Sequence, residues 1–371
     1  MVWACLSLIG VGFAAALPLT WVCRAAAGRL GQLDAPGERK IHDRPIPATG
    51  GVAIVLATVG AMGLALAGAW LAPGRWWAAA AGGAVVEHLP GVRAQTPMAV
   101  GVLGAMLILH VLGLVDDRRG LGAGVKLAVQ VAVAGAVAWG LGIRTLTLLG
   151  PVASIGLTAV WIVAMTNAFN MLDNMDGLSG GVAAICGAVL LGCALMGGQW
   201  FVAGLLALLV GSLLGFLVFN FPPASIFMGD GGSLVVGFTL AVGSVRLTYV
   251  GVEPALGASG PGAHWWAVFT PIVVMAVPLY DLVSVTGIRL AQGRNPLVGD
   301  TQHFSHRLVR RGLSRRAAVI VIYACTASTA LGGVLLGRVP GWAAAIVVAQ
   351  VGMVLLTLGL LERARGGGPE A

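Results

Sequence analysis

Charged side chains are scarce in this chain, at 10% of its 371 residues, and lysine is the scarcest of them. Only Lys40 and Lys126 stand beside twenty arginines, nine aspartates and five glutamates. Hydrophobic residues, by contrast, make up 58% of the sequence. So little charge excludes an ordinary soluble protein of this length and places the chain among membrane proteins.

Cysteine is also sparse, and its spacing excludes two kinds of cross-link. None of the five cysteines forms a Cys-x-x-Cys pair, and all lie in or beside apolar segments: Cys5, Cys23, Cys186, Cys193 and Cys325. Neither a disulfide framework nor a zinc site is expected from this pattern. The cysteines are interpreted as small apolar residues.

Long apolar runs recur along the whole sequence. Each is long enough to cross about 30 Å of hydrocarbon as a helix. We count eleven, and ten is also compatible with the pattern: near 3–23, 50–73, 97–115, 124–141, 151–170, 178–196, 200–220, 232–252, 265–288, 317–337 and 341–361. The first has no basic region before it and is expected to be a retained helix. The sequence predicts an all-α, multi-pass membrane protein with one integral-membrane domain over 1–362 and a disordered tail over 363–371.

The basic residues alternate with these runs. The loops at 24–49 and 289–316 are the most basic, and the loops at 116–123, 171–177 and 221–231 lie on the same side by parity. Because basic loops stay on the cytoplasmic side, this side is expected to face the cytoplasm. The same rule, with attraction to anionic lipid headgroups, accounts for the formal charge of +8 without nucleic acid as a partner.

The nine aspartates gather at this same end of the apolar segments. A carboxylate at the bilayer centre costs roughly 2.5–3.5 kcal/mol, so acids in such a chain are expected to be functional. Asp116 and Asp117 are adjacent at the end of one run, where the helix dipole disfavours acids, and Lys126 follows ten residues later. A solvated helix end is the alternative interpretation of this pair.

A polar ladder closes the fifth run. Asn167, Asn170 and Asp173 are three residues apart and share a helix face, and Asp176 follows at the turn. Oxygen ligands of this type suit Mg²⁺, which keeps water or substrate phosphate as its remaining ligands. Polar lining between helices is the alternative.

Three further features lie on the same side. Asp230 precedes Gly231 and Gly232 at the start of a run, where it is either a helix cap or part of a phosphate site. The last basic loop carries Arg294, His303 and His306, a set that suits phosphate recognition; lipid headgroups are the alternative ligand. The role of Asp281, within the ninth run, stays open. Together these parts indicate phosphoryl chemistry at a membrane surface.

With these motifs in view, the chain resembles the polyprenyl-phosphate N-acetylhexosamine-1-phosphate transferases, and most closely the bacterial branch that loads N-acetylglucosamine 1-phosphate onto undecaprenyl phosphate. Five ordered motifs carry the resemblance: residues 34–51, 114–117 with Lys126, 167–178, 219–234 and 300–308. The resemblance implies that undecaprenyl phosphate attacks a UDP-N-acetylhexosamine, releasing UMP, at a cytoplasmic-side cleft in the bacterial inner membrane. The product would begin the synthesis of a cell-wall polysaccharide.

The resemblance also implies site residues. Asn170 and Asp230 would hold Mg²⁺, or Mn²⁺ in its place. Asp116, Asp117, Asp230 and His303 would be catalytic. Substrate would contact the remaining motif residues, with Asp176 towards the uracil: Lys126, Asp173, Asp176, Arg294, His306, Arg39, Lys40 and His42. Attack in one step and attack through an aspartyl intermediate both remain open, and a homodimer is compatible with the family.

Two positions depart from the family pattern. Asn174 stands where the family usually has glycine, and Ser305 replaces the middle histidine of a His-x-His-His run. The second departure leaves the identity of the sugar open. A phospho-MurNAc-pentapeptide transferase is the alternative within the family. From another class, a transporter or lipid flippase would place charges near the midplane and often shows repeated halves, and no repeat is visible here.

Overall fold

The structure, a computed structural model, describes residues 2–30, 32–34, 45–81, 83–247, 265–295 and 302–362. Three residues of the predicted substrate site, Arg39, Lys40 and His42, lie outside these ranges, as do Asp43, Asp300 and the tail over 363–371. Everything said below refers to the described residues.

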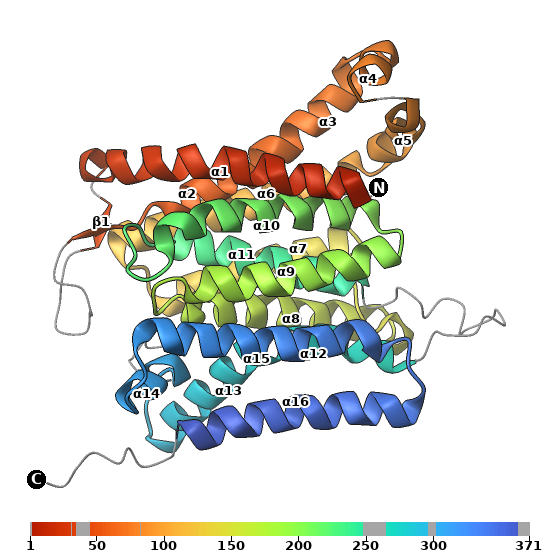
Figure 1. The fold of residues 1–371 in the computed structure, drawn as a ribbon. Coiled ribbons are helices and arrows are strands. Elements are labelled where there is room, and N and C mark those ends of the chain that lie inside the picture. Colours follow the sequence, from red (N-terminus) through yellow and green to blue (C-terminus); the bar gives the residue numbers. More distant parts are fainter. Residues whose placement is uncertain are drawn as a thin grey trace, which may run out of the picture.

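The chain forms a bundle of long helices that run side by side (Figure 1). The long helices are α1 (Val2–Leu30), α6 (Thr96–Arg119), α7 (Ala123–Gly140), α8 (Pro151–Leu172), α9 (Leu178–Met196), α10 (Trp200–Asn220), α11 (Asp230–Leu247), α15 (Arg315–Leu336) and α16 (Gly341–Leu361). The shorter ones are α2 (Gly50–Val55), α3 (Ala61–Leu71), α4 (Gly74–Ala81), α5 (Gly83–Ala94), α12 (Thr270–Val274), α13 (Ala276–Ala291) and α14 (Phe304–Arg310). Because lipid offers no partner for a free backbone N–H or C=O, helices are the expected way for this chain to cross a membrane.

The predicted all-α class is confirmed. Among the described residues, nine helical segments are long and apolar enough to span a membrane, or ten with the bent pair Trp265–Val274 and Ala276–Ala291. That pair bends by 68°, so the predicted run at 265–288 is broken rather than straight. The nine include Gly50–Leu71, which joins α2 and α3, and do not include α11. The predicted run near 232–252 corresponds to α11, which carries a charge near each end. The chain is therefore a multi-pass membrane protein.

A short antiparallel ribbon is the only β-structure in the described ranges. It pairs β1 (Leu33–Asp34) with β2 (Ile46–Pro47). The backbone then joins the start of α2 to the loop before α11, because Gly50 N donates to Phe227 O at 2.9 Å and Gly51 N to Met228 O at 2.8 Å. The first turn of α2, which follows the ribbon, therefore lies beside the N-terminal end of α11.

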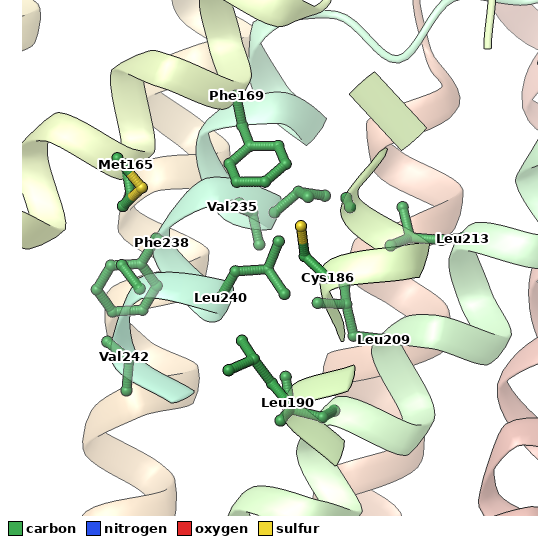
Figure 2. Packing of buried hydrophobic residues seen from close by; sticks show 14 of the residues in the cluster. Met165, Phe169, Cys186, Leu190, Leu209, Leu213, Val235, Phe238, Leu240 and Val242 are labelled. Carbon is green, nitrogen blue, oxygen red and sulfur yellow. The ribbon is translucent and has the colours of Figure 1, made fainter. Parts of the chain in front are cut away.

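Helix α11 lies at the centre of the apolar core. All of its residues are buried except Asp230, the first, and Arg246, the last but one. Side chains from α8, α9 and α10 pack against it, among them Phe169, Cys186 and Leu209 (Figure 2). A helix that is apolar on every side is expected only in such a fully enclosed position.

Small residues let α1 and α10 pack backbone to backbone. A Cβ added at Gly211 would lie 2.1 Å from Ile9 O, and one added at Gly12 would lie 2.5 Å from Leu208 O. Gly211 and Gly215 form a Gly-x-x-x-Gly pair, the pattern that permits close helix approach in membranes.

Gly211→Ala should therefore lower the thermal stability of the purified protein. The added methyl group collides with the α1 backbone, and overpacking of this kind costs about 1–3 kcal/mol. Gly192→Ala on α9 is the matched control, because nothing lies within 4 Å of a Cβ at that position. Thermal unfolding in detergent measures both variants, and a Gly211→Ala protein as stable as Gly192→Ala would contradict the close packing.

Candidate functional site

Asp116 and Lys126 form an ion pair between the end of α6 and the first turn of α7. Lys126 Nζ lies 2.6 Å from Asp116 Oδ2, and Leu121 N donates to Asp116 Oδ1 at 2.6 Å. Gly120, with φ of 61°, ends α6 in the left-handed conformation and turns the chain back over Asp116. The ammonium group of Lys126 offsets the unfavourable interaction between the Asp116 carboxylate and the negative end of the α6 dipole.

Asp117 points instead at the start of α11. Its Oδ1 accepts from Asp230 N at 2.9 Å, and its Oδ2 accepts from Gly231 N at 3.2 Å. The first N–H groups of a helix lack partners within it and attract negative charge. Gly229 makes room, since its φ is +72° and a Cβ there would lie 2.8 Å from Asp117 Oδ2.

Asp230 is held from both sides. Lys126 Nζ lies 3.2 Å from its Oδ2, and Asn170 Nδ2 donates to its Oδ1 at 2.8 Å. Asn170 also contacts Ser233 Oγ at 2.9 Å, one turn along α11. The side chain of Asp230 keeps 27% of its surface exposed, so the carboxylate is reachable from outside. Helices α6, α7, α8 and α11 thus converge on one group.

The polar residues that share one face of α8 have different partners in the structure. Asn167 Nδ2 bonds Gln130 Oε1 on α7 at 2.5 Å, whereas Asn170 reaches Asp230. Asp173, just beyond the end of α8, forms no ion pair with a lysine or arginine in the part of the chain that the structure describes. Burial, and then the negative charges of Asp230 and Asp117, raise the pKa of Asp173 to about 8. Asp176 accepts from Ala224 N at 2.9 Å and is tied to the loop before α11.

The two histidines differ in their surroundings. His303 Nδ1 lies 2.7 Å from Oδ2 of Asp281, a fully buried carboxylate of α13, and Phe304 N donates to the other oxygen at 3.3 Å. Asp281, whose role the sequence left open, therefore orients His303. His306 is 6.3 Å from His303 between ring centroids. Burial, and then the nearby His303 and Arg310, lower the pKa of His306 to about 4, so its ring is neutral near pH 7.

The structure therefore brings Asp116, Asp117, Lys126, Asn170 and Asp230 into direct contact. Asp173 lies close enough to Asp230 and Asp117 for their charges to raise its pKa. Arg294 is exposed just beyond the end of α13. Ser233 lies within the predicted motif 219–234, whereas His110 was not predicted from the sequence. His110 is buried in α6, with its Nδ1 2.7 Å from Gly231 O. A polar side chain within an apolar run is the signal that points to it.

A divalent cation fits the donors at Asp230. No cluster of three or more His, Cys, Asp or Glu side chains able to hold a metal exists among the described residues. Mg²⁺ does not require one, because it binds through one or two carboxylates and keeps water and phosphate oxygens as its other ligands. The Asp230 carboxylate supplies hard oxygen atoms of that kind. Asn170 turns its N–H group towards Asp230 here, and its amide oxygen would become a ligand once the amide rotates.

Several known proteins that this chain resembles are named for the same type of transfer. The glycosyl transferase family 4 model matches residues 99–248. A probable undecaprenyl-phosphate N-acetylglucosaminyl 1-phosphate transferase of Bacillus subtilis is 32% identical, over 83% of this chain and 78% of its own length. The decaprenyl-phosphate N-acetylglucosaminephosphotransferase of Mycobacterium tuberculosis H37Rv is 33% identical, over 83% and 76%. The undecaprenyl-phosphate alpha-N-acetylglucosaminyl 1-phosphate transferase of Escherichia coli K12 is 27% identical, over 84% and 78%.

The two positions that depart from the family motifs touch each other. Ser305 Oγ donates to Asn174 Oδ1 at 2.7 Å, and Asn174 Nδ2 donates to Met171 O at 2.7 Å. Ser305 is fully buried at the start of α14. The bond ties the loop that carries Asp173 and Asp176 to the helix that carries His306. We interpret the two departures as one change that keeps these segments together.

A double-mutant cycle over Asn174→Ala and Ser305→Ala tests this interpretation. Because one hydrogen bond joins the two side chains, the double variant should be less destabilised than the sum of the single variants, by about 1 kcal/mol. Thermal unfolding of the four proteins in detergent measures the coupling. Asn174→Ala combined with Thr357→Ala on the exposed face of α16 should be additive. Additive behaviour of both pairs would contradict the interpretation.

Proposed function

This chain belongs to glycosyl transferase family 4, and on that premise we propose that it transfers N-acetylglucosamine 1-phosphate from a UDP-sugar to a polyprenyl phosphate. Undecaprenyl phosphate is the proposed acceptor. The observation that carries the proposal is the convergence of Asp116, Lys126, Asn170 and Asp230 from four helices, in a chain whose relatives are named for this type of transfer.

In the proposed reaction an oxygen of the lipid phosphate attacks the phosphorus that carries the sugar. A new P–O bond joins lipid and sugar phosphate, and the bond between the two phosphates of the UDP-sugar breaks. The electron pair leaves with UMP. Because such transition states spread negative charge over phosphoryl oxygens, the site has to position the groups and supply positive charge.

Lys126 is the residue placed for the second task. Its Nζ lies between the Asp116 and Asp230 carboxylates, at 2.6 and 3.2 Å, so a phosphate oxygen entering the site meets an oriented cation. The acceptor is a phosphate monoester, largely doubly ionised at pH 7 since its second pKa is about 6. Asp116 is therefore needed to hold Lys126 more than to remove a proton. His306, as a neutral ring, would donate or accept a hydrogen bond at substrate.

The hydrogen bonds at the aspartates favour direct attack by the lipid over an aspartyl intermediate. Both oxygens of Asp116, of Asp117 and of Asp230 already accept from an N–H or an ammonium group. A carboxylate bonded at both oxygens is a weaker nucleophile than the ionised phosphate of the acceptor.

We further propose that Asp230 and Asn170 hold Mg²⁺, with Mn²⁺ able to replace it. The ion would neutralise the pyrophosphate of the donor. The chain's own contribution is to fix the two ligands, which the Ser233 and Lys126 contacts do. Burial first, and then the negative charges of Asp230 and Asp117, raise the pKa of Asp173, and the second of these causes supports a cation at the site.

The basic loops and the placement of the aspartates support a cytoplasmic site in a bacterial inner membrane. The contacts among Asp116, Lys126, Asn170 and Asp230 lie where α6 and α8 end and α7 and α11 begin, at one end of the bundle, as an interfacial enzyme requires. A transporter would instead place its charges near the midplane. The names of the relatives favour N-acetylglucosamine over a MurNAc-pentapeptide. A homodimer stays a prediction, which light scattering in detergent would measure.

Purified protein given undecaprenyl phosphate and UDP-N-acetylglucosamine should release UMP, and EDTA should stop the release until Mg²⁺ is added. A panel of other UDP-sugars, including UDP-MurNAc-pentapeptide, defines the donor. If no donor gave UMP release, the proposed transferase function would be wrong. If EDTA did not affect the release, the proposed metal requirement would be wrong.

Asp230→Asn and Asp116→Asn should each lower kcat by at least 10²-fold, the order found when one electrostatic contact to a transition state is lost. Each change keeps the shape of the side chain but weakens the contact to Lys126. Gln350→Ala, which removes a bond between α16 and Ser328, is the control expected to retain activity. Unfolding temperature and gel filtration show whether the inactive proteins are folded; near-normal turnover in either aspartate variant removes that residue from the site.

A further inference from the structure

A pocket opens at the end of the bundle opposite the candidate site. It encloses about 430 Å³ and is lined by α1, α3, α5, the loop before α10, the first half of α10 and the end of α11. The lining includes Leu8, Met62, Leu66, Phe201 and Leu208, which make it largely apolar. In Figure 1, α3 and α5 lie at the same end as the N-terminus, opposite the β1 ribbon. A volume of this size falls in the range of about 300–1,000 Å³ that holds small-molecule ligands.

Arg246 places a positive charge in this pocket. It is the last residue but one of α11, roughly 24 Å along the helix axis from Asp230 at 1.5 Å per residue. Its Nε atom is buried and has no hydrogen-bond partner. In the part of the chain that the structure describes, its guanidinium makes no ion pair within 4.0 Å. A buried N–H group of a charged guanidinium that lacks an acceptor is costly, so the pocket favours an anion beside Arg246.

The surface around the pocket indicates where the anion comes from. On α3 the side chains of Leu64 and Leu71 are 76% and 83% exposed, as expected of a helix that faces lipid tails. A ligand reaching the pocket from this surface needs a hydrocarbon part as well as a charge. Basic pockets between membrane helices are known to hold phosphate headgroups of lipids.

Glu87 limits the charge of that headgroup. It lines the same pocket and is exposed, as is His88 beside it. A carboxylate near the bound phosphate disfavours a doubly ionised monoester and tolerates a phosphodiester, which carries a single negative charge.

We propose that this pocket binds one membrane glycerophospholipid, with its phosphodiester on Arg246 and an acyl chain among Leu8, Met62 and Leu208. Gly91 and Gly204 of the lining leave the space open. Nothing lies within 4 Å of a Cβ at Gly91, so a larger side chain there enters the pocket without displacing its neighbours. The pocket is separate from the proposed transferase site and its occupancy is independent of that reaction.

Native mass spectrometry of the detergent-purified protein, titrated with phosphatidylethanolamine, tests the proposal. The native protein should bind one lipid at least tenfold more tightly than any further copies. Arg246→Gln should lose that preference because the phosphate has no cation, and Gly91→Leu should lose it because the pocket is filled.

Matched controls separate the pocket from general lipid adhesion. Arg338→Gln removes an exposed arginine that contacts Met196 at the same end of the bundle, and Gly104→Leu adds the same side chain where nothing lies within 4 Å. Both should bind lipid like the native protein. Equal binding by Arg246→Gln and the native protein would overturn the proposal.

Probes that lack one half of the lipid identify the ligand class. Diacylglycerol, which has no phosphate, and inorganic phosphate, which has no chain, should not compete for the first site. Undecaprenyl phosphate, a monoester, should compete at least tenfold more weakly than phosphatidylethanolamine. Displacement of the first phosphatidylethanolamine by inorganic phosphate alone, or by undecaprenyl phosphate at an equal or lower concentration, would overturn the assignment to a phospholipid.

Discussion

The N-terminus of α11 is the point on which the site depends. A helix leaves its first N–H groups without partners within the helix, and these groups of α11 point towards the neighbouring helix α6. Asp117 supplies two of the missing acceptors from a neighbouring helix. This contact brings α6 so close that a Cβ at Gly113 would lie 2.4 Å from the carbonyl of Asp230. Because Asp117 is adjacent to Asp116, fixing one carboxylate on α11 places the other beside Lys126. Asp117 therefore has a structural role at the start of α11, and Asp116 has a chemical role beside Lys126.

The same arrangement leaves the site with too little positive charge. The carboxylates of Asp116 and Asp230 share the ammonium of Lys126, and Asp117 and Asp173 lie close enough to Asp230 to interact with it electrostatically. The pKa of about 8 at Asp173 reports this imbalance, because burial and the neighbouring charges both favour its neutral form. A pyrophosphate alone would add more negative charge. A divalent cation that binds together with the pyrophosphate would offset this excess of negative charge. The proposed metal and the proposed donor are therefore expected to bind together.

Sequence analysis located the helices and most of the residues that meet at the site. Apolar runs set where helices form, and polar residues at run ends marked Asp116, Lys126, Asn170 and Asp230. It did not separate Asp117 from Asp116, since which carboxylate caps α11 depends on how two helices are rotated and how closely they pack. Asn167 was grouped with Asn170 by helical spacing, yet it bonds Gln130 on α7. The pairing of Asp281 with His303 joins residues from α13 and α14, and no local pattern encodes that distance.

Helix α11 also sets what each end of the bundle can bind. Its interior is apolar on every side, so charge is tolerated only at its two ends, and there the helix dipole favours an acid first and a base last. Asp230 and Arg246 follow that order. The acid end attracts cations and, through them, phosphates; the basic end, about 24 Å away by the rise of 1.5 Å per residue, attracts an anion directly. Because the buried sides of α11 make it a rigid rod packed on several helices, neither end can shift without repacking the core of Figure 2. Burial of this one helix thus accounts both for the proposed catalytic site and for the proposed lipid pocket.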